Sequence, residues 1–419
     1  MHYVIIGNSA AGVFAAEAIR GLDSSGKITI ISEENNRPYS RCLTSYYIGE
    51  EIDQDRIYIR DANFYAATGI DFIPQKVEQV NDTEKSVTLQ SGEIVGYDKL
   101  LIATGASPYS LPVAGLDLEG VFELRTLEDA RRIMDFAPHV KEAVVMGAGL
   151  VGLKGAHALH ELGIKVSIIV NSRIMSRSVD PHTGQIITEL LEQDGYEVIY
   201  NTKLSKILGQ DKVEGVCLSS GKEIPCQLVL MAAGVSPNVD LVKNTGIEVN
   251  KGIIVDKHMQ TTVPHIYAAG DVAEAYHAVW DEKRVISIWP VATAQGTVAG
   301  SNMAGVERIY EGSVGSNSAV FCGVGVVSAG IPYLPTGEGK ELSTYDKVTK
   351  RYRKFIVKDD ILVGMIMVGD IDGAGILTAM IKQKTKVSLE TLNYWLNHSV
   401  QFQGYCTAEA KGGIVCGIC

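Results

Sequence analysis

Two glycine-rich turns in this chain each follow a short apolar run directly, a pattern that suits dinucleotide binding. A turn without bulky side chains lets a pyrophosphate approach backbone N–H groups at the positive end of a helix dipole. Because the turns lie about 140 residues apart, they predict a flavin site and a nicotinamide site between which a hydride can pass. The residues expected to bind are Gly7, Ser9, Ala10, Ala11 and Gly12 in the first turn and Gly147, Gly149, Leu150, Val151 and Gly152 in the second.

Two carboxylates stand where such cofactors need them. Glu33 follows the apolar run 27–32, about 20 residues after Gly12, where a carboxylate is expected to accept hydrogen bonds from the ribose hydroxyl groups. A second apolar phrase, 262–272, ends in Gly270 and Asp271. The alternative for Asp271 is an ordinary helix N-cap.

Composition limits the protein's class. The 419 residues suffice for two or three domains, and 46% hydrophobic with 21% charged residues is ordinary for a globular protein. The net charge of −11 argues against nucleic acid as a partner. No apolar stretch approaches the roughly 20 residues of a membrane span, and residues 1–3 lead into the first predicted strand without a secretion signal, so we expect a cytoplasmic protein.

These phrases resemble the FAD/NAD(P)-dependent pyridine nucleotide oxidoreductase superfamily, with its NADH oxidases, coenzyme A disulfide reductases, rubredoxin and ferredoxin reductases, and the flavin portion of nitrite reductases. The resemblance implies that Gly270 and Asp271 bind the ribityl chain and that a helix following them points its N-terminus at the flavin, stabilising the anionic reduced form. It also implies that the segment from Trp289 packs on the flavin ring. Further residues expected to bind a cofactor are Arg41, Cys42, Ala103, Thr104, Gly105, Gly234, Trp289 and Pro290.

The nicotinamide half departs from this family twice. Lys154 occupies a position where the family carries a glutamate near the nicotinamide; the alternative is a solvated helix lysine. The strand 166–170 ends in Asn171 and Arg173 rather than in the acid that rejects a 2′-phosphate, and Arg173 or Arg177 could attract that phosphate. NAD(H) and NADP(H) both stay open, with NAD(H) slightly favoured.

Cys42 lies where the family places a redox-active residue, four positions before Tyr46. Coenzyme A disulfide reductases and NADH oxidases share this spacing, whereas rubredoxin reductases often lack the cysteine. We expect Arg41 and a helix start to lower the pKa of the thiol. The alternative is a small residue that lines the flavin cavity. The lack of a Cys-x4-Cys pair near the first helix excludes the two-cysteine dithiol mechanism.

Three of the seven cysteines, Cys406, Cys416 and Cys419, fall in the last 14 residues. They could ligate a metal or an iron–sulfur cluster, act as a dithiol relay, or do nothing. Three thiolates are one short of the usual four, so a fourth ligand would come from Cys322 or from a partner chain.

We therefore predict an α/β fold with a split FAD-binding domain (1–108 and 237–312), an NAD(P)-binding domain (109–236), an α+β interface domain (313–403) and a cysteine-rich tail (404–419). The predicted function is FAD-dependent electron exchange between NAD(P)H and an iron–sulfur protein of ferredoxin or rubredoxin type. The alternatives are a disulfide or persulfide reductase or NADH oxidase acting through Cys42, and a flavin-binding regulatory protein. A homodimer or a larger redox complex is expected.

Overall fold

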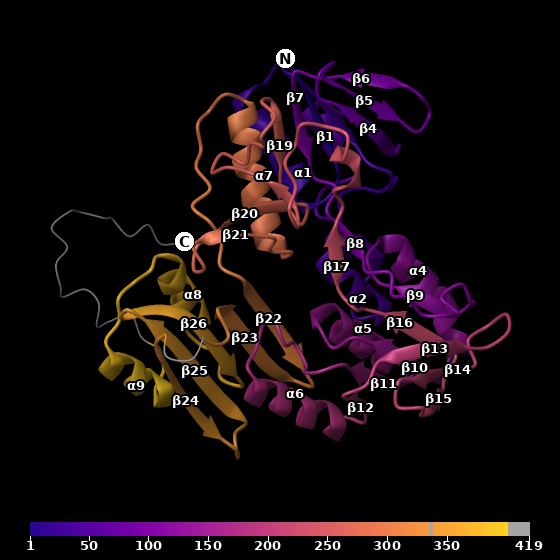
Figure 1. The fold of residues 1–419 in the computed structure, drawn as a ribbon, viewed down its shortest axis with the longest axis vertical. Helices are drawn as coiled ribbons and strands as arrows, with labels where there is room; N and C mark the ends of the chain where they lie inside the picture. The colour runs from indigo at the N-terminus through magenta and orange to yellow at the C-terminus, as the bar shows by residue number, and fades with distance from the viewer. Residues whose placement is uncertain (335–337, 401–419) are drawn as a thin grey trace. The chain divides into compact units, whose positions relative to one another are not determined.

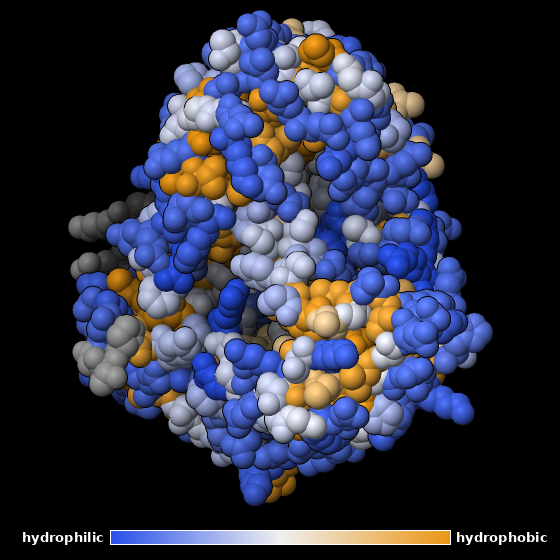
Figure 2. Space-filling model, turned by 45° about the vertical axis from the view of Figure 1, so that its right-hand side comes forward, coloured by the Kyte–Doolittle hydropathy of each residue, from blue (hydrophilic) through white to orange (hydrophobic). Residues whose placement is uncertain are grey.

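The computed structural model describes residues 1–334 and 338–400, and the chain divides into two compact units (Figure 1). Unit 1 comprises residues 1–176 and 184–313, and unit 2 comprises residues 177–183 and the chain from Val314 on. None of the helices in the described part is long and apolar enough to cross a membrane. The face drawn in Figure 2 is mostly hydrophilic, with apolar patches between the polar side chains.

The first sheet of unit 1 is parallel and almost wholly buried. In spatial order its strands are β19 (Ile266–Ala268), β7 (Lys99–Ile102), β1 (His2–Ile6), β2 (Lys27–Ile31) and β3 (Ile70–Ile73). The near-continuous runs of β-branched residues in β1 and β2 are typical of strands covered on both faces. Since β19 follows β7 by more than 160 residues in sequence, two distant stretches of chain build one sheet.

Two helices of unit 1 pack unusually closely: α1 (Ala10–Leu22), which follows β1, and α7 (Trp289–Met303). A Cβ at Gly296 would lie 2.2 Å from the carbonyl oxygen of Ala11, and one at Gly300 would lie 2.4 Å from that of Ala15. Glycine therefore permits the approach. The residue number rises by four along each helix between these two contacts, so α1 and α7 run in the same direction. They lie side by side and begin at the same end (Figure 1).

A second parallel sheet repeats the arrangement. Its strands are, in order, β12 (Glu197–Tyr200), β11 (Lys165–Val170), β10 (Glu142–Met146), β16 (Leu228–Met231) and β9 (Val121–Glu123). Helix α5 (Leu150–Glu161) follows β10 through the second glycine turn. Helix α4 (Leu127–Phe136) precedes β10 in the chain and begins with a capping box between Thr126 and Asp129.

Shorter elements join these sheets. The strands are β4 (Val77–Asn81), β5 (Ser86–Leu89), β6 (Ile94–Gly96), β8 (Ala106–Pro108), β13 (Leu204–Leu208), β14 (Gly215–Leu218), β15 (Glu223–Pro225), β17 (Val235–Pro237), β18 (Ile253–Ile254), β20 (Ala273–His277) and β21 (Glu282–Arg284). The helices are η1 (Arg41–Leu43), α2 (Thr44–Ile48), η2 (Gln54–Ile57), α3 (Phe64–Thr68), η3 (Ala137–His139) and η4 (Asp240–Val242), where η marks a 3-10 turn.

The segment directly after Asp271 is strand β20, so the alternative in which Asp271 is an ordinary helix N-cap is wrong. The backbone of β20 pairs with β18 and β21 instead, and the next helix is α7, which begins at Trp289. The N-terminus expected to face a flavin is therefore that of α7.

Unit 2 contains an antiparallel sheet followed by helices, which agrees with the predicted α+β character of the interface domain. Its strands are, in order, β22 (Ser316–Phe321), β23 (Val324–Gly330), β26 (Ile361–Val368), β25 (Arg351–Lys358) and β24 (Lys340–Asp346). Helices α8 (Ala374–Lys382) and α9 (Leu389–Asn397) follow it, and α6 (Pro181–Gln193) starts in residues that belong to this unit. Together with the parallel sheets of unit 1, this confirms the predicted α/β class; the predicted domain boundaries stay a prediction.

Candidate dinucleotide and redox site

The first glycine turn can be formed only by glycine at two positions. Gly7 has a φ of +121°, and a Cβ there would lie 2.2 Å from the carbonyl oxygen of Ala103. A Cβ at Gly12 would lie 1.9 Å from the carbonyl oxygen of Gly7. Ser9 is the N-cap of α1 and makes no side-chain cap hydrogen bond. The first N–H groups of α1 thus lack a side-chain cap, as a pyrophosphate site requires.

The second turn has the same geometry. Gly147 has a φ of +114°, and a Cβ there would lie 2.3 Å from the carbonyl oxygen of Ala232. A Cβ at Gly152 would lie 2.1 Å from the carbonyl oxygen of Gly147. At Gly149, the N-cap of α5, no described atom beyond its chain neighbours lies within 4 Å of the Cβ position. This turn is open at its middle glycine, so a phosphate can approach it.

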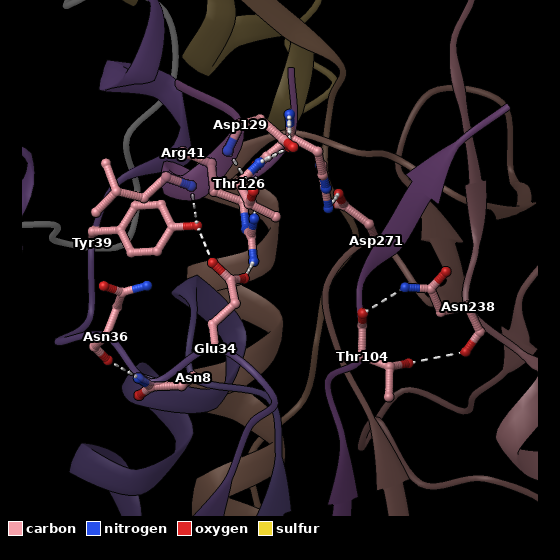
Figure 3. A network of polar contacts seen from close by, with 12 residues as sticks. Asn8, Glu34, Asn36, Tyr39, Arg41, Thr104, Thr126, Asp129, Asn238 and Asp271 are labelled. Carbon is pink, nitrogen blue, oxygen red and sulfur yellow. Dashed lines mark hydrogen bonds and ion pairs between the residues drawn. The ribbon is translucent and has the colours of Figure 1, made fainter. Parts of the chain in front are cut away.

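The loop after β2 is tied to the first turn. Asn8 donates its side-chain N–H to the carbonyl oxygen of Asn36 at 3.0 Å (Figure 3). The other side-chain atom, Asn8 Oδ1, is buried without a hydrogen-bond partner among the described residues. Glu33 is exposed and makes no hydrogen bond or ion pair with any described residue. Both acceptors are therefore available to the hydroxyl groups of a ribose.

Asp271 is joined to Arg125, a residue that the sequence analysis did not single out. Their side chains form an ion pair with 3.0 Å between Arg125 Nη2 and Asp271 Oδ2. Asp129 fixes the backbone of this segment, since its carboxylate accepts the N–H groups of Arg125 (3.1 Å) and Thr126 (2.8 Å). The available signal was the capping box, which begins directly after Arg125.

Gly270 lies against the first turns of α1 and α7. A Cβ at Gly270 would lie 3.2 Å from that of Ala11 and 3.7 Å from that of Ala292. Its N–H donates to the side-chain oxygen of Gln295 at 2.8 Å, and Gln295 is buried. Two positive helix ends thus begin beside the Gly270–Asp271 pair, which favours an anionic ligand.

A network of polar side chains fixes the segment before Cys42 (Figure 3). Arg41 forms an ion pair with Glu34 and donates a second N–H to the carbonyl oxygen of Arg125 at 2.7 Å. Tyr39 donates to Glu34 at 2.5 Å and accepts the N–H of Leu127 at 3.0 Å. The charge of Arg41 is therefore compensated by Glu34, which lies next to the predicted ribose ligand in sequence.

The prediction that the pKa of Cys42 is lowered is wrong. Although the residue is exposed, desolvation by the surrounding protein raises the pKa of its thiol, a hydrogen bond with Ser40 opposes this in part, and Asp271 adds to the rise. Arg41 supplies little positive potential because it is paired with Glu34. Cys42 also lies in the single 3-10 turn η1, so no long helix dipole acts on it.

The remaining predicted residues lie at strand ends and turns of unit 1. Thr104 Oγ1 donates to the carbonyl oxygen of Asn238 at 3.0 Å, and the Asn238 side chain donates back to the carbonyl oxygen of Thr104 at 2.9 Å (Figure 3). Gly234 has a φ of +114° and lies against the Tyr109 ring.

The predicted residues after β11 lie at the surface or beside a turn. Asn171 is exposed after β11, and Arg173 donates to the carbonyl oxygen of Ser176 at 3.4 Å. Trp289 and Pro290 form the first turn of α7.

The metal prediction rests on residues that are mostly outside the described part. Cys406, Cys416 and Cys419 lie there, and Cys322 occupies the turn between β22 and β23 in unit 2. Within residues 1–334 and 338–400, no group of three or more His, Cys, Asp or Glu could hold a metal ion. A cluster at the tail cysteines stays a prediction.

Comparison with known families decides the class of protein. Residues 1–296 match the family model described as pyridine nucleotide-disulphide oxidoreductase. The chain belongs to this family. Residues 316–385 match a second model, the rubredoxin NAD+ reductase C-terminal domain. At the level of the family, the predicted resemblance and the prediction of an oxidoreductase are confirmed.

The curated relatives that the chain matches are covered over different shares of their own length. The chain is 34% identical over 391 residues to nitrite reductase [NAD(P)H] of Bacillus subtilis (strain 168), covering 92% of this chain and 48% of that protein. It is 32% identical over 391 residues to the epsilon subunit of NADH-dependent phenylglyoxylate dehydrogenase of Aromatoleum evansii, covering 92% of each. It is 34% identical over 284 residues to rubredoxin-NAD(+) reductase of Ectopseudomonas oleovorans, covering 67% of this chain and 74% of that protein. The chain thus spans about half the length of the nitrite reductase that it matches.

Solved structures share the fold. An NAD-dependent persulfide reductase from A. fulgidus superposes with a TM-score of 0.87 at 27% identity, covering 92% of this chain and 77% of that one. A covalent putidaredoxin reductase–putidaredoxin complex superposes with a TM-score of 0.86 at 25% identity, covering 93% and 95%.

The family implies FAD and a nicotinamide dinucleotide, and the residues fit both. The two glycine turns leave room that a Cβ would fill, Glu33 has no hydrogen-bond or ion-pair partner among the described residues, and two helix N-termini begin beside Gly270. The fit is physical: tight backbone, positive helix ends and an available carboxylate are what a dinucleotide needs.

Proposed function

We propose that this protein is an FAD-dependent NAD(P)H oxidoreductase that exchanges electrons with an iron–sulfur protein of ferredoxin or rubredoxin type. The observation that carries the proposal is the pairing of two dinucleotide turns in unit 1 with a C-terminal domain of the rubredoxin NAD+ reductase kind at residues 316–385. The names of two relatives, rubredoxin-NAD(+) reductase and putidaredoxin reductase, support it.

Each cofactor would have defined partners. When bound, FAD supplies a group that accepts a hydride and releases electrons one or two at a time. The turn at Gly7–Gly12 would hold its pyrophosphate, Glu33 its ribose and Asp271 its ribityl chain, while the N-terminus of α7 would face the anionic reduced form. The turn at Gly147–Gly152 would hold the nicotinamide dinucleotide at the N-terminus of α5.

The protonation state of Cys42 favours an electron-transfer partner over a disulfide. Only a thiolate attacks sulfur, and desolvation raises the pKa of the Cys42 thiol. Near neutral pH the cysteine is therefore mostly a thiol. Transfer of single electrons from a flavin to an iron–sulfur centre requires no thiolate.

A second candidate is reduction of a small disulfide or persulfide through Cys42. Its support is the exposure of the thiol and the likeness to a persulfide reductase. In this reaction the Cys42 thiolate would attack one sulfur of the substrate and release the other as a thiolate. NADH oxidase activity belongs to the same alternative.

One experiment separates the candidates. Wild type and Cys42→Ser, both loaded with FAD, are reduced anaerobically with NADH or NADPH and then mixed with rubredoxin, ferredoxin or coenzyme A disulfide. We expect Cys42→Ser to retain flavin reduction and at least half of the rate with the iron–sulfur proteins. Failure of the wild type to reduce either iron–sulfur protein while it turns over the disulfide would overturn the proposal in favour of the second candidate.

A further inference from the structure

Lys154, in the helix that begins at the second glycine turn, lies against α2, the helix that directly follows the turn containing Cys42. Lys154 is in the second turn of α5, and its Nζ lies 4.7 Å from the centroid of the Tyr46 ring. Tyr46 belongs to α2, which directly follows the turn η1 containing Cys42. Both helices are in unit 1, and they pack closely enough that a Cβ at Gly49 would lie 3.3 Å from the Cα of Ala158.

Lys154 differs in its partner from three arginines of unit 1. Arg37 is paired with Asp55, Arg41 with Glu34, and Arg125 with Asp271. Lys154 forms no ion pair with a carboxylate in the described part of the chain and contacts an aromatic face instead. A ring attracts a cation through its quadrupole but carries no net charge. Lys154 therefore places beside α2 a positive charge that no carboxylate of the described residues compensates through an ion pair.

This charge is carried by the helix that begins at the second glycine turn and faces the helix that follows Cys42. Lys154 is one turn beyond the open Gly149 position, where the pyrophosphate of a nicotinamide dinucleotide would lie, and its side chain is directed toward α2. In hydride transfer, C4 of the reduced nicotinamide loses a hydride and the ring becomes a cation, while the flavin gains the hydride and becomes an anion. A nearby ammonium group disfavours the first product and favours the second.

We infer that Lys154, held over Tyr46, is a positioning residue that weakens binding of the oxidised nicotinamide relative to the reduced one and stabilises the reduced flavin. The inference rests on the proposed function. It also assigns Tyr46 a role, because the ring holds the ammonium group in place without neutralising it.

The test compares Lys154→Gln and Lys154→Arg with Lys165→Gln, a matched control on an exposed lysine that pairs with Glu142 in the same sheet region. Two quantities are measured on FAD-loaded protein: the dissociation constant of NAD+, by calorimetry, and the midpoint potential of the flavin, by dye-equilibrated titration. For Lys154→Gln we expect NAD+ to bind about tenfold more tightly and the flavin to become harder to reduce by a similar factor, about 30 mV for a two-electron couple. Lys154→Arg and Lys165→Gln should match the wild type.

A second pair of variants tests the role of the ring. Tyr46→Leu should reproduce part of the Lys154→Gln effect on both quantities, and Tyr46→Phe should not. Equal weakening of NAD+ and of a reduced, unreactive NADH analogue in Lys154→Gln would show a phosphate contact and overturn the inference, as would an unchanged flavin potential. A wild-type flavin that NAD(P)H does not reduce would overturn the proposed function itself, and that result is seen before any variant is made.

Discussion

The guanidinium group of Arg125 lies 3.0 Å from the carboxylate of Asp271, a residue 146 positions later in the chain. This pair brings the segment before α4 to the Gly270–Asp271 phrase, beside the first turns of α1 and α7. Because both side chains are mostly buried, each protects the other from the cost of an unpaired charge. The pair thus holds the Asp271 carboxylate, a hydrogen-bond acceptor, and the Arg125 guanidinium group, a donor, in place at the proposed flavin site.

Substitution of Asp271 by alanine should yield protein that retains little FAD. The change removes the predicted ribityl ligand and leaves the Arg125 charge without its partner. Flavin content per chain after gel filtration is the measurement. Lys27→Ala, which removes one side of an exposed pair with Asp71, is the control and should keep full occupancy. Full flavin retention in Asp271→Ala would show that the motif has been misread.

The choice between NADH and NADPH should be weak. The strand β11 is followed by exposed Asn171, so no carboxylate there repels a 2′-phosphate. We expect the ratio of kcat/KM values to stay below about a hundredfold, or about 2.7 kcal/mol. Asn171→Asp should raise the preference for NADH, whereas Asn171→Ser should leave it nearly unchanged. A wild-type ratio well above a hundredfold contradicts the prediction.

The sequence predicted the parts of this site that depend on neighbouring residues. The two glycine turns and the strands before them follow from local patterns of glycine and apolar residues. Contacts between distant residues were not predictable in the same way. Arg125 reaches Asp271, and Lys154 reaches the Tyr46 ring, only because the fold brings separate helices and turns together.

The error at Cys42 has the same origin. Arg41 is adjacent in sequence and so seemed available to stabilise a thiolate. In the folded protein its guanidinium group turns to Glu34 and to the carbonyl oxygen of Arg125. The direction of the shift in the Cys42 pKa therefore depends on burial and on Asp271, which is far away in sequence, and a residue-by-residue pattern contains neither.

The raised pKa of Cys42 predicts slow alkylation at neutral pH. The rate constant of iodoacetamide with Cys42 should keep rising with pH above the range in which an ordinary thiol has already ionised, because desolvation disfavours the thiolate. The rate is measured by mass spectrometry of the peptide that contains Cys42, with Cys42→Ser to identify the signal. A plateau below pH 7 would mean a lowered pKa and would restore the case for a reactive thiolate.

The tail prediction concerns residues outside the described part. Truncation before Gly404 removes Cys406, Cys416 and Cys419. We expect reduction of the flavin by NAD(P)H to stay near the wild-type rate and transfer to the iron–sulfur partner to fall sharply, since the predicted role of these cysteines is an electron exit. A triple serine variant of the full chain is the matched control, and iron and acid-labile sulfide are assayed in both. Unchanged transfer in the two variants would remove the tail from the mechanism.

His277 should make the protein lose stability in mild acid. The side chain is buried at the end of β20, where Nδ1 accepts the N–H groups of Val279 (3.1 Å) and Trp280 (3.3 Å). Burial lowers its pKa to about 4, with Arg284 contributing. Because the unfolded chain takes up this proton near pH 6.5 and the folded protein does so only near 4, the free energy of unfolding falls as the pH drops through that window. The loss in the free energy of unfolding is about 3 kcal/mol at most.

This loss should be measured by urea denaturation between pH 7 and 4. His277→Gln should flatten this slope and His139→Gln, at an exposed position, should leave it unchanged; equal slopes in all three proteins would place the acid sensitivity elsewhere.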